Sequence, residues 1–428
     1  MIKINSIFYC AFQNSSFRNG LWFSFFSFLN SGVSFLIMML MASFVQPDSF
    51  GKLSLFTTLV SLFSIFINLG TGVMVGINFF TSPRIVIRNY LNVSFIISCG
   101  VFVAYVAFLL VFREMLQEAM GLEVSFQFLA VAFCFLQFYN NTALEIWRLE
   151  EKVGRYGCYS FLSVVANLVL TVLFVVPMGL DWQGRVYAQF LTCLLFAVLS
   201  LYILVKKGYL KFVIPTKHYF VEALKFGLPL MPHSTSFFLR QGLDRYIINS
   251  FFLPSTVGFF SFSYNFANII QTIGMAFNAS YSVNIYKNLS TIDGNSLQCL
   301  RRNCRYLVRV YSVITLGVWG MATLFIPILF PKYNDCIVYL FPLCGGAMFQ
   351  CFYLVYVNIL LFYKRTKVLM YITFSCSLLH CVMSLLLTKY GVIYTAYISL
   401  FSNMLIFMGV YWYSQKVLRL CTVDIVES

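Results

Sequence analysis

The chain has 428 residues, of which 60% are hydrophobic and only 10% are charged. A soluble domain of this length needs far more polar surface, so the composition excludes a water-soluble globular protein and indicates a membrane protein. The net charge of +15 would favour nucleic acid as a partner of a soluble chain. In a membrane chain it indicates basic loops beside anionic head groups, so we expect membrane lipids and no nucleic acid as partners.

Twelve apolar runs, each near or above the ~20 residues that a spanning helix needs, alternate with short polar connections. In chain order the predicted spans are residues 21–45, 53–79, 91–112, 124–146, 156–177, 182–205, 226–251, 256–280, 306–330, 336–362, 367–388 and 391–414. The predicted fold class is therefore an all-α polytopic membrane protein with about 12 transmembrane helices. The longest external connection is roughly 113–123, which leaves no external domain to host chemistry.

The Lys and Arg residues gather in every second connection. Of the 29, 22 lie on one side of the predicted membrane, Arg240 and Arg245 lie inside a span, and the other five are Lys52, Arg113, Arg185, Lys332 and Lys389. Loops rich in Lys and Arg stay in the cytoplasm, so we expect both termini there. The basic stretch 206–225 is then a cytoplasmic loop.

The 13 Cys residues mostly lie inside apolar runs and form no CxxC pair. Such thiols usually act as small apolar fillers, so we expect neither disulfides nor a metal site. No cofactor is predicted.

The chain repeats a turn. Residues Pro47, Gly51 and Ser54 after the first span match Pro254, Gly258 and Ser261 after the seventh, at a constant offset of 207 residues. Either a common turn recurs by chance or a six-helix unit is duplicated. An even number of helices inserts both copies the same way up, so duplication predicts two lobes related by a parallel pseudo-two-fold repeat around a central cavity. We expect an N-terminal lobe over 1–205 and a C-terminal lobe over 206–428, joined by loop 206–225.

The predicted span 226–251 carries charges that a membrane helix ordinarily lacks. At 100° per residue, His233, Arg240 and Asp244 fall within about 40° of one another, whereas Arg245 lies about 100° from Asp244. A charge near the bilayer centre costs at least ~2.5 kcal/mol, so it normally faces protein or water. Only Arg240 and Arg245 are clearly intramembrane cations in this pattern. The positions 207 residues earlier than Arg240, Asp244 and Arg245 are uncharged: Val33, Ile37 and Met38.

Two interpretations of these charges stay open. Arg240 and Asp244 could neutralise each other as a structural i,i+4 pair, or the charges could line a cationic cavity that holds an anion. Arg suits phosphate because its planar fork makes bidentate hydrogen bonds. The candidate substrate-binding residues are therefore Arg240, Arg245, Asp244 and His233. Asp244 could also couple transport to protons, although two nearby Arg residues should keep it ionised.

Other polar residues have simpler explanations. Pro229 and Pro232 should break the start of span seven before His233, and both His233 and His380 are expected mainly as packing residues. Glu145 and Arg148, at i,i+3, suggest a surface ion pair that could instead line a cytoplasmic entrance. The candidate entrance residues are Arg18, Arg84, Glu145 and Arg148.

With these residues identified, the chain resembles the polysaccharide/O-antigen flippases (Wzx-type) of the multidrug/oligosaccharidyl-lipid/polysaccharide exporter superfamily. The resemblance lies in Phe226-Gly227-Leu228-Pro229, in Asp244-Arg245-Tyr246-Ile247-Ile248, and in the 257–264 run after the repeated turn. It implies translocation of an undecaprenyl-diphosphate-linked oligosaccharide across the bacterial inner membrane, for O-antigen or related polysaccharide synthesis. It also implies a non-enzymatic transporter, with a polysaccharide polymerase and a chain-length regulator as candidate partners.

Two alternatives remain. A small-molecule or cation antiporter of the same superfamily would be expected to use carboxylates rather than Arg in its cavity. A membrane polysaccharide polymerase or ligase would need acid, base or Arg and His groups on a sizeable external loop, and the short external connections argue against it.

Overall fold

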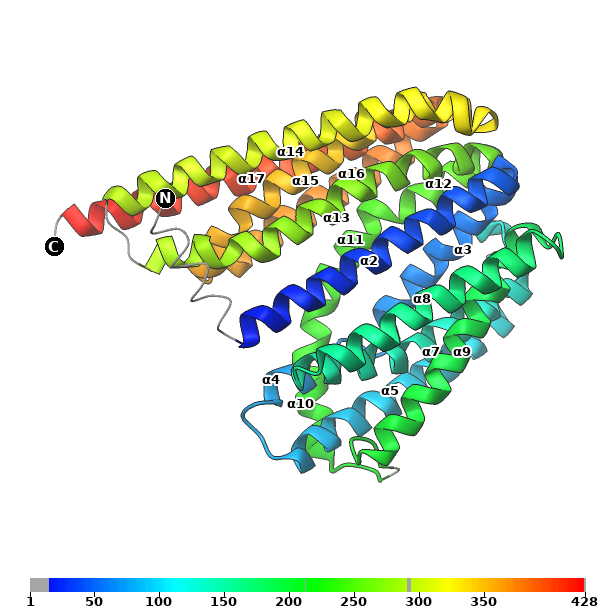
Figure 1. Ribbon diagram of the computed structural model, residues 1–428, viewed down its shortest axis with the longest axis horizontal. Helices are drawn as coiled ribbons and strands as arrows, with labels where there is room; N and C mark the ends of the chain where they lie inside the picture. The colour runs from blue at the N-terminus through cyan, green and yellow to red at the C-terminus, as the bar shows by residue number, and fades with distance from the viewer. Residues whose placement is uncertain (1–14, 212, 291–293, 427–428) are drawn as a thin grey trace. The chain divides into compact units, whose positions relative to one another are not determined.

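The computed structural model describes residues 15–211, 213–290 and 294–426, and this part of the chain contains helices and no strand (Figure 1). Nine of its helices are long and apolar enough to cross a membrane. The predicted class of an all-α polytopic membrane protein is confirmed. Each of the twelve predicted spans falls on a helix or on a pair of broken helices.

Contacts divide the chain into two compact units. The first comprises residues up to Val45 together with Leu55–Ser234, and the second comprises Gln46–Ser54 together with Thr235–Ser428. Two helices, α3 and α11, therefore contribute to both. The lobe boundary at 205/206 stays a prediction.

The first unit is built from long antiparallel helices joined by short turns. Its elements are α2 (Ser15–Phe44), most of α3 (Pro47–Phe66), α4 (Val73–Asn78), α5 (Arg84–Val111), α6 (Arg113–Met120), α7 (Val124–Leu149), α8 (Val153–Val175), α9 (Asp181–Lys206) and α10 (Lys217–Gly227). Helices α2, α7, α8 and α9 pack on one another, and α10 packs on α4 and α5. One buried cluster, which includes Met74, Tyr90, Ile146 and Leu204, lies where α4, α5, α7, α9 and α10 meet.

The predicted span 53–79 is broken between α3 and α4. The backbone of Leu69 and Gly70 is left-handed, with φ of 48° and 71°. The Asn68 side chain accepts a hydrogen bond from the Gly70 amide at 3.1 Å, and the Thr71 hydroxyl donates to the Asn68 carbonyl at 2.6 Å and to Ser94 Oγ at 3.0 Å. These bonds satisfy backbone groups that the break would otherwise leave unpaired. Gly227, at the end of α10, packs backbone to backbone against this break.

The first unit also includes η1 (Leu228–Leu230) and the start of α11 (Met231–Gln241), whose remainder, from Thr235, belongs to the second unit. The other helices of the second unit are α12 (Leu243–Phe251), α13 (Pro254–Ser290), α14 (Gly294–Leu329), η2 (Pro331–Cys336), α15 (Ile337–Phe362), α16 (Thr366–Leu387), η3 (Thr388–Tyr390) and α17 (Val392–Val426). Helix α15 packs on α13, α14 and α17, and α16 lies against α17.

The two copies of the repeated turn contact each other inside the second unit. Pro47 and Pro254 begin α3 and α13, a position where proline's missing N–H leaves no bond unmade. A Cβ built on Gly51 would lie 1.9 Å from the Pro254 carbonyl oxygen, and one built on Gly258 would lie 2.0 Å from the Pro47 carbonyl oxygen. Three residues further along each helix, the Ser54 and Ser261 hydroxyls are 2.6 Å apart. The motif thus forms a reciprocal contact, here called the repeat seam.

Candidate functional site

The charged span is broken twice. The turn at Leu228–Leu230, which contains Pro229, precedes α11, as the prolines predict. A second break at Gly242 separates α11 from α12 and lies between Arg240 and Asp244. Both side chains nevertheless reach the same neighbour. Arg240 contacts Asn403 and Asp244 contacts Ser399, which are four residues apart on α17. The predicted common face of Arg240 and Asp244 is present in the structure.

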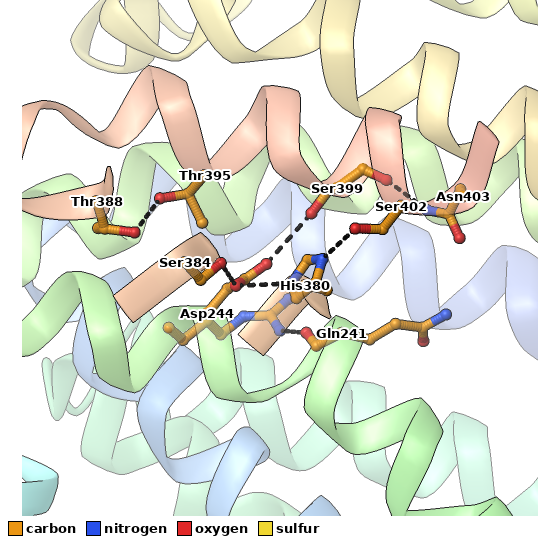
Figure 2. Close-up of polar contacts among 10 residues, drawn as sticks. Gln241, Asp244, His380, Ser384, Thr388, Thr395, Ser399, Ser402 and Asn403 are labelled. Atoms are coloured by element: carbon orange, nitrogen blue, oxygen red, sulfur yellow. Dashed lines mark hydrogen bonds and ion pairs between the residues drawn. The ribbon is translucent and has the colours of Figure 1, made fainter. Parts of the chain in front are cut away.

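Asp244 is 2% exposed and accepts hydrogen bonds from three side chains (Figure 2). His380 Nε2 lies 3.0 Å and Ser384 Oγ 2.8 Å from its Oδ1, and Ser399 Oγ lies 3.2 Å from its Oδ2. His380 is 1% exposed, and its Nδ1 lies 3.1 Å from Ser402 Oγ. A buried carboxylate needs such a set of donors to offset its lost hydration. This Asp244 cluster ties α12 to α16 and α17.

Arg240 is 7% exposed and does not use Asp244 as its partner. Its Nη1 donates to Asn403 Oδ1 at 3.0 Å, and its guanidinium lies over the Phe237 ring, 5.2 Å from the centroid. Within the described residues its Nε has no hydrogen-bond partner, and no carboxylate forms an ion pair with it. The structural-pair interpretation therefore does not describe Arg240, whose charge is not compensated by any carboxylate of the described residues.

Arg245 faces another direction, as its helical angle predicts. Its Nε donates to Ser261 Oγ at 3.1 Å and its Nη1 to the Gln241 carbonyl at 2.5 Å. The guanidinium stacks over Tyr264, 4.8 Å from the ring centroid. Since Ser261 also bonds Ser54, Arg245 is attached to the repeat seam. The Arg245 guanidinium is held by α13, whereas Arg240 is held by α17.

The remaining predicted site residues lie in the first unit or outside the description. The side chains of Arg18 and His233 lie outside the described residues. Arg84 is exposed, with its guanidinium 5.4 Å from the centroid of the Tyr209 ring. Arg148 Nη2 pairs with Glu145 Oε1 at 2.6 Å.

Glu145 and Arg148 line a cavity of about 670 Å³ in the first unit. The same cavity is lined by the α3–α4 break, including Asn68 and Gly70, and by Asn141. The pair is therefore at the mouth of a cavity as well as near the surface, a geometry that accommodates either interpretation of these residues.

A second charged cluster holds the ends of α7 and α9 together. Glu150 accepts a hydrogen bond from the Tyr209 hydroxyl at 2.6 Å and pairs with Lys152 at 2.8 Å and Lys207 at 3.5 Å. Burial alone would raise the pKa of Glu150, but the bonds from Lys152 and Tyr209 and the charge of Lys207 outweigh it and lower that pKa. Burial lowers the pKa of Lys207, and burial with the bond to Glu150 raises the pKa of Tyr209 to about 12.

The surroundings of two residues were not foreseen from the sequence. Arg185, counted with the external cations although the predicted span 182–205 contains it, lies in α9, within the candidate span Asp181–Lys206, and lines a cavity. His380, expected mainly as a packing residue, is buried and is the imidazole partner of Asp244. Neither residue has a recognisable motif, because their partners come from other helices. Within the described residues no group of His, Cys, Asp and Glu could hold a metal ion.

Comparisons with known proteins place the fold. A family model described as polysaccharide biosynthesis protein matches residues 16–281. A protein of the Lsg locus of Haemophilus influenzae is 22% identical over 391 residues, covering 90% of this chain and 94% of that protein. A membrane protein of the same organism is 24% identical over 349 residues, covering 78% and 81%.

Solved transporter structures share the fold. An inward-facing multidrug resistance MATE family transporter of the MOP superfamily has a TM-score of 0.74 at 17% identity, covering 93% of this chain and 96% of that chain. The lipid II flippase MurJ, in an inward closed conformation, has a TM-score of 0.73 at 13% identity, covering 92% and 87%. The resemblance seen in the sequence is confirmed. Because the family model covers more than half of the chain, the protein belongs to the polysaccharide biosynthesis protein family.

Proposed function

We propose that the protein flips undecaprenyl-diphosphate-linked oligosaccharide repeat units from the cytoplasmic to the periplasmic leaflet of the bacterial inner membrane. It does so by alternating access through a cationic cavity, with both termini in the cytoplasm, in the synthesis of O-antigen or a related surface polysaccharide. A lipid-linked glycan cannot cross hydrocarbon alone, because its diphosphate and hydroxyls would lose their water without replacement.

The observation that carries this proposal is the uncompensated charge of Arg240. A guanidinium with five N–H donors is buried in α11, within the predicted span 226–251, has no carboxylate within ion-pair distance among the described residues, and keeps its Nε–H unused. Burying such a group destabilises the folded protein, and an anionic substrate beside the guanidinium would offset this destabilisation while it is bound. A diphosphate oxygen is the acceptor that the guanidinium fork suits best.

The neighbouring residues would hold Arg240 in position. Asn403 accepts from Arg240, and its own amide donates to the Ser399 carbonyl at 2.9 Å, while the Ser399 hydroxyl bonds Asp244. Arg240 is therefore linked through α17 to the Asp244 cluster. We assign Asp244 to positioning, and Arg245 and His233 to the same proposed substrate region. Arg18, Arg84, Glu145 and Arg148 remain the proposed entrance residues.

The test is substitution of Arg240 in cells that depend on this chain for surface polysaccharide. Arg240→Gln should abolish surface polymer and cause lipid-linked units to accumulate on the cytoplasmic side, while Arg240→Lys should retain part of the activity. Arg113→Gln is the matched control, because this exposed guanidinium already pairs with Glu114. Normal polymer from a stably inserted Arg240→Gln protein would remove Arg240 from the mechanism and leave the proposal without its main support.

One observation favours a second candidate, a small-molecule or cation antiporter. The buried carboxylate of Asp244 and its imidazole partner form the kind of titratable pair that could exchange a proton for a cation. Deleting the chain would then change drug tolerance and leave surface glycan intact. No observation favours a polymerase or ligase, and a polymerase and chain-length regulator remain proposed partners.

A further inference from the structure

The first unit contains a small cavity that the proposed function does not use. Its volume is about 260 Å³, and helices α2, α7, α8 and α9 line it. These four helices pack on one another within the first unit (Figure 1). We call it the Arg185 cavity, after the cationic residue on its wall. At this size it holds one sugar-sized group rather than a whole repeat unit, since pockets for larger ligands start near 300 Å³.

Within the part of the chain that the structure describes, Arg185 is a cation without an ion-pair partner. Its Nη1 donates to Asn167 Oδ1 and, at 2.8 Å, to Thr171 Oγ1, both on α8. None of the seven ion pairs in the described residues includes Arg185, and both of these side-chain hydrogen bonds run through Nη1. Two neutral acceptors orient the guanidinium from one side, so the rest of the fork is left for a ligand in the cavity.

The rest of the wall suits a hydroxyl-rich ligand. Five side-chain amides line the cavity: Gln137, Asn140, Asn141, Asn167 and Gln189. A side-chain amide carries both donors and an acceptor, which is the complement that sugar hydroxyls need. Asn140 and the Asn167 oxygen are already bonded within the protein, so Gln137, Asn141 and Gln189 are the amides proposed to meet a ligand. Tyr159 adds an aromatic surface and is itself fixed, because its hydroxyl bonds Asn140 Oδ1 and the Phe196 carbonyl, each at 2.8 Å.

The number of charges on the cavity wall indicates which kind of anion the cavity can bind. Among the described residues that line the cavity there is no Lys, Asp, Glu or His, so this wall carries a single positive charge, that of Arg185. A diphosphate carries more than one negative charge and would be undercompensated there. A carboxylate carries one, and the guanidinium fork matches it in a bidentate geometry. The 670 Å³ cavity differs in that its Arg148 is already paired with Glu145.

We infer that the Arg185 cavity binds one carboxylate-bearing sugar residue, with Arg185 holding the carboxylate and the amides holding the hydroxyls. That this sugar belongs to the transported glycan rests on the proposed function, whereas binding of the free sugar acid does not. The glycan carried would then contain an acidic sugar.

The test measures binding of three probes to the full chain in lipid nanodiscs: glucuronate, its neutral counterpart glucose, and inorganic phosphate. Saturation-transfer NMR gives the affinities. We expect glucuronate to bind the wild-type protein about tenfold or more tightly than glucose or phosphate, because a charge-assisted bidentate contact contributes about that much. Arg185→Gln should reduce glucuronate binding to the level of glucose, Arg185→Lys should lose part of the preference, and the control Arg113→Gln should lose none.

A second variant covers the case in which Arg185→Gln does not fold. Gln189→Leu removes a hydroxyl partner and should weaken glucuronate and glucose by the same factor. Equal binding of glucuronate and glucose by wild-type protein would overturn the inference. So would binding of phosphate as tight as glucuronate, which would identify a phosphate subsite, or an Arg185→Gln protein that keeps the glucuronate preference.

The two proposals fail separately. If Arg185-dependent glucuronate binding is found but reconstituted protein moves no lipid-linked saccharide, the cavity stands and the flippase assignment falls. If translocation is found without any glucuronate preference, the flippase assignment stands and the inference about the cavity is wrong.

Discussion

The repeat seam makes a prediction that needs no functional assay. In Gly51→Ala, the new Cβ would lie 1.9 Å from the Pro254 carbonyl oxygen; in Gly258→Ala it would lie 2.0 Å from that of Pro47. Both obstacles are backbone atoms of helix starts, so no side-chain rotation can relieve them. The helices must move apart by at least about 1 Å to reach the 3.0 Å below which real Cβ contacts essentially do not occur.

The cost follows from that movement. Overpacking of this kind costs about 1–3 kcal/mol, and stretching the 2.6 Å Ser54–Ser261 hydrogen bond costs about 1 kcal/mol more. The higher helix propensity of Ala returns about 1 kcal/mol. Each substitution should therefore lower the free energy of unfolding by about 1–3 kcal/mol. Because the same widening relieves both clashes, the double variant should cost less than the sum of the two.

The assay is thermal unfolding of purified protein in detergent, followed by tryptophan fluorescence at one fixed scan rate, since membrane proteins often unfold irreversibly. Gly100→Ala is the control, because a Cβ there meets nothing within 4 Å, and it should leave the melting temperature unchanged or raise it. The reciprocal contact would be refuted if either Gly51→Ala or Gly258→Ala had the melting temperature of the wild-type protein.

Three further predictions use the same melting assay. His380→Ala removes a hydrogen-bond donor from the buried Asp244 carboxylate and should lower the free energy of unfolding by about 1–3 kcal/mol. An unchanged melting temperature would contradict this. Folding lowers the pKa of Glu150, so ionised Glu150 stabilises the folded protein above its unfolded pKa of about 4.3, and this stabilisation is lost as pH falls through the folded pKa. Glu150→Gln should therefore reduce the fall of the melting temperature at acid pH. The same fall in the variant as in the wild type would exclude Glu150 as its source. Gly227→Ala places a Cβ 2.3 Å from the Leu69 carbonyl oxygen and should lower the melting temperature, whereas tolerance would mean that the α3–α4 break is not packed on α10.

The fold followed from the sequence because the signals for membrane helices are local. Apolar runs of spanning length and the proline pair at 229 and 232 located the helices and the start of the broken span. The repeated turn was visible at its 207-residue offset, but that its copies pack against each other was not, since duplicated motifs need not meet. The helix break at Gly242 could not be predicted either, because glycine is common inside membrane helices.

The site was predicted less completely because its contacts join distant helices. Arg240 and Asp244 stood out as charges in an apolar run, and their common face followed from helical spacing. Their true partners, Asn403 and His380, lie 163 and 136 residues away and show no periodic relation to them. Arg185 was counted with the external cations because the charge count could not distinguish a loop cation from one in the second turn of a helix. The amides of α7 and α8 that surround it were the only signal, and such residues often serve helix packing alone.

The central claim is that Arg240 stays buried without a carboxylate partner among the described residues because an anionic lipid-linked glycan passes beside it. The most direct measurement is translocation of a fluorescent undecaprenyl-diphosphate-linked saccharide in proteoliposomes, read as the loss of the reagent-protected pool over time. We predict movement by wild-type protein and a rate at least about tenfold lower for Arg240→Gln at equal reconstitution, as expected for loss of a charge-assisted contact. Equal rates for the two proteins, or no movement by the wild type, would contradict it.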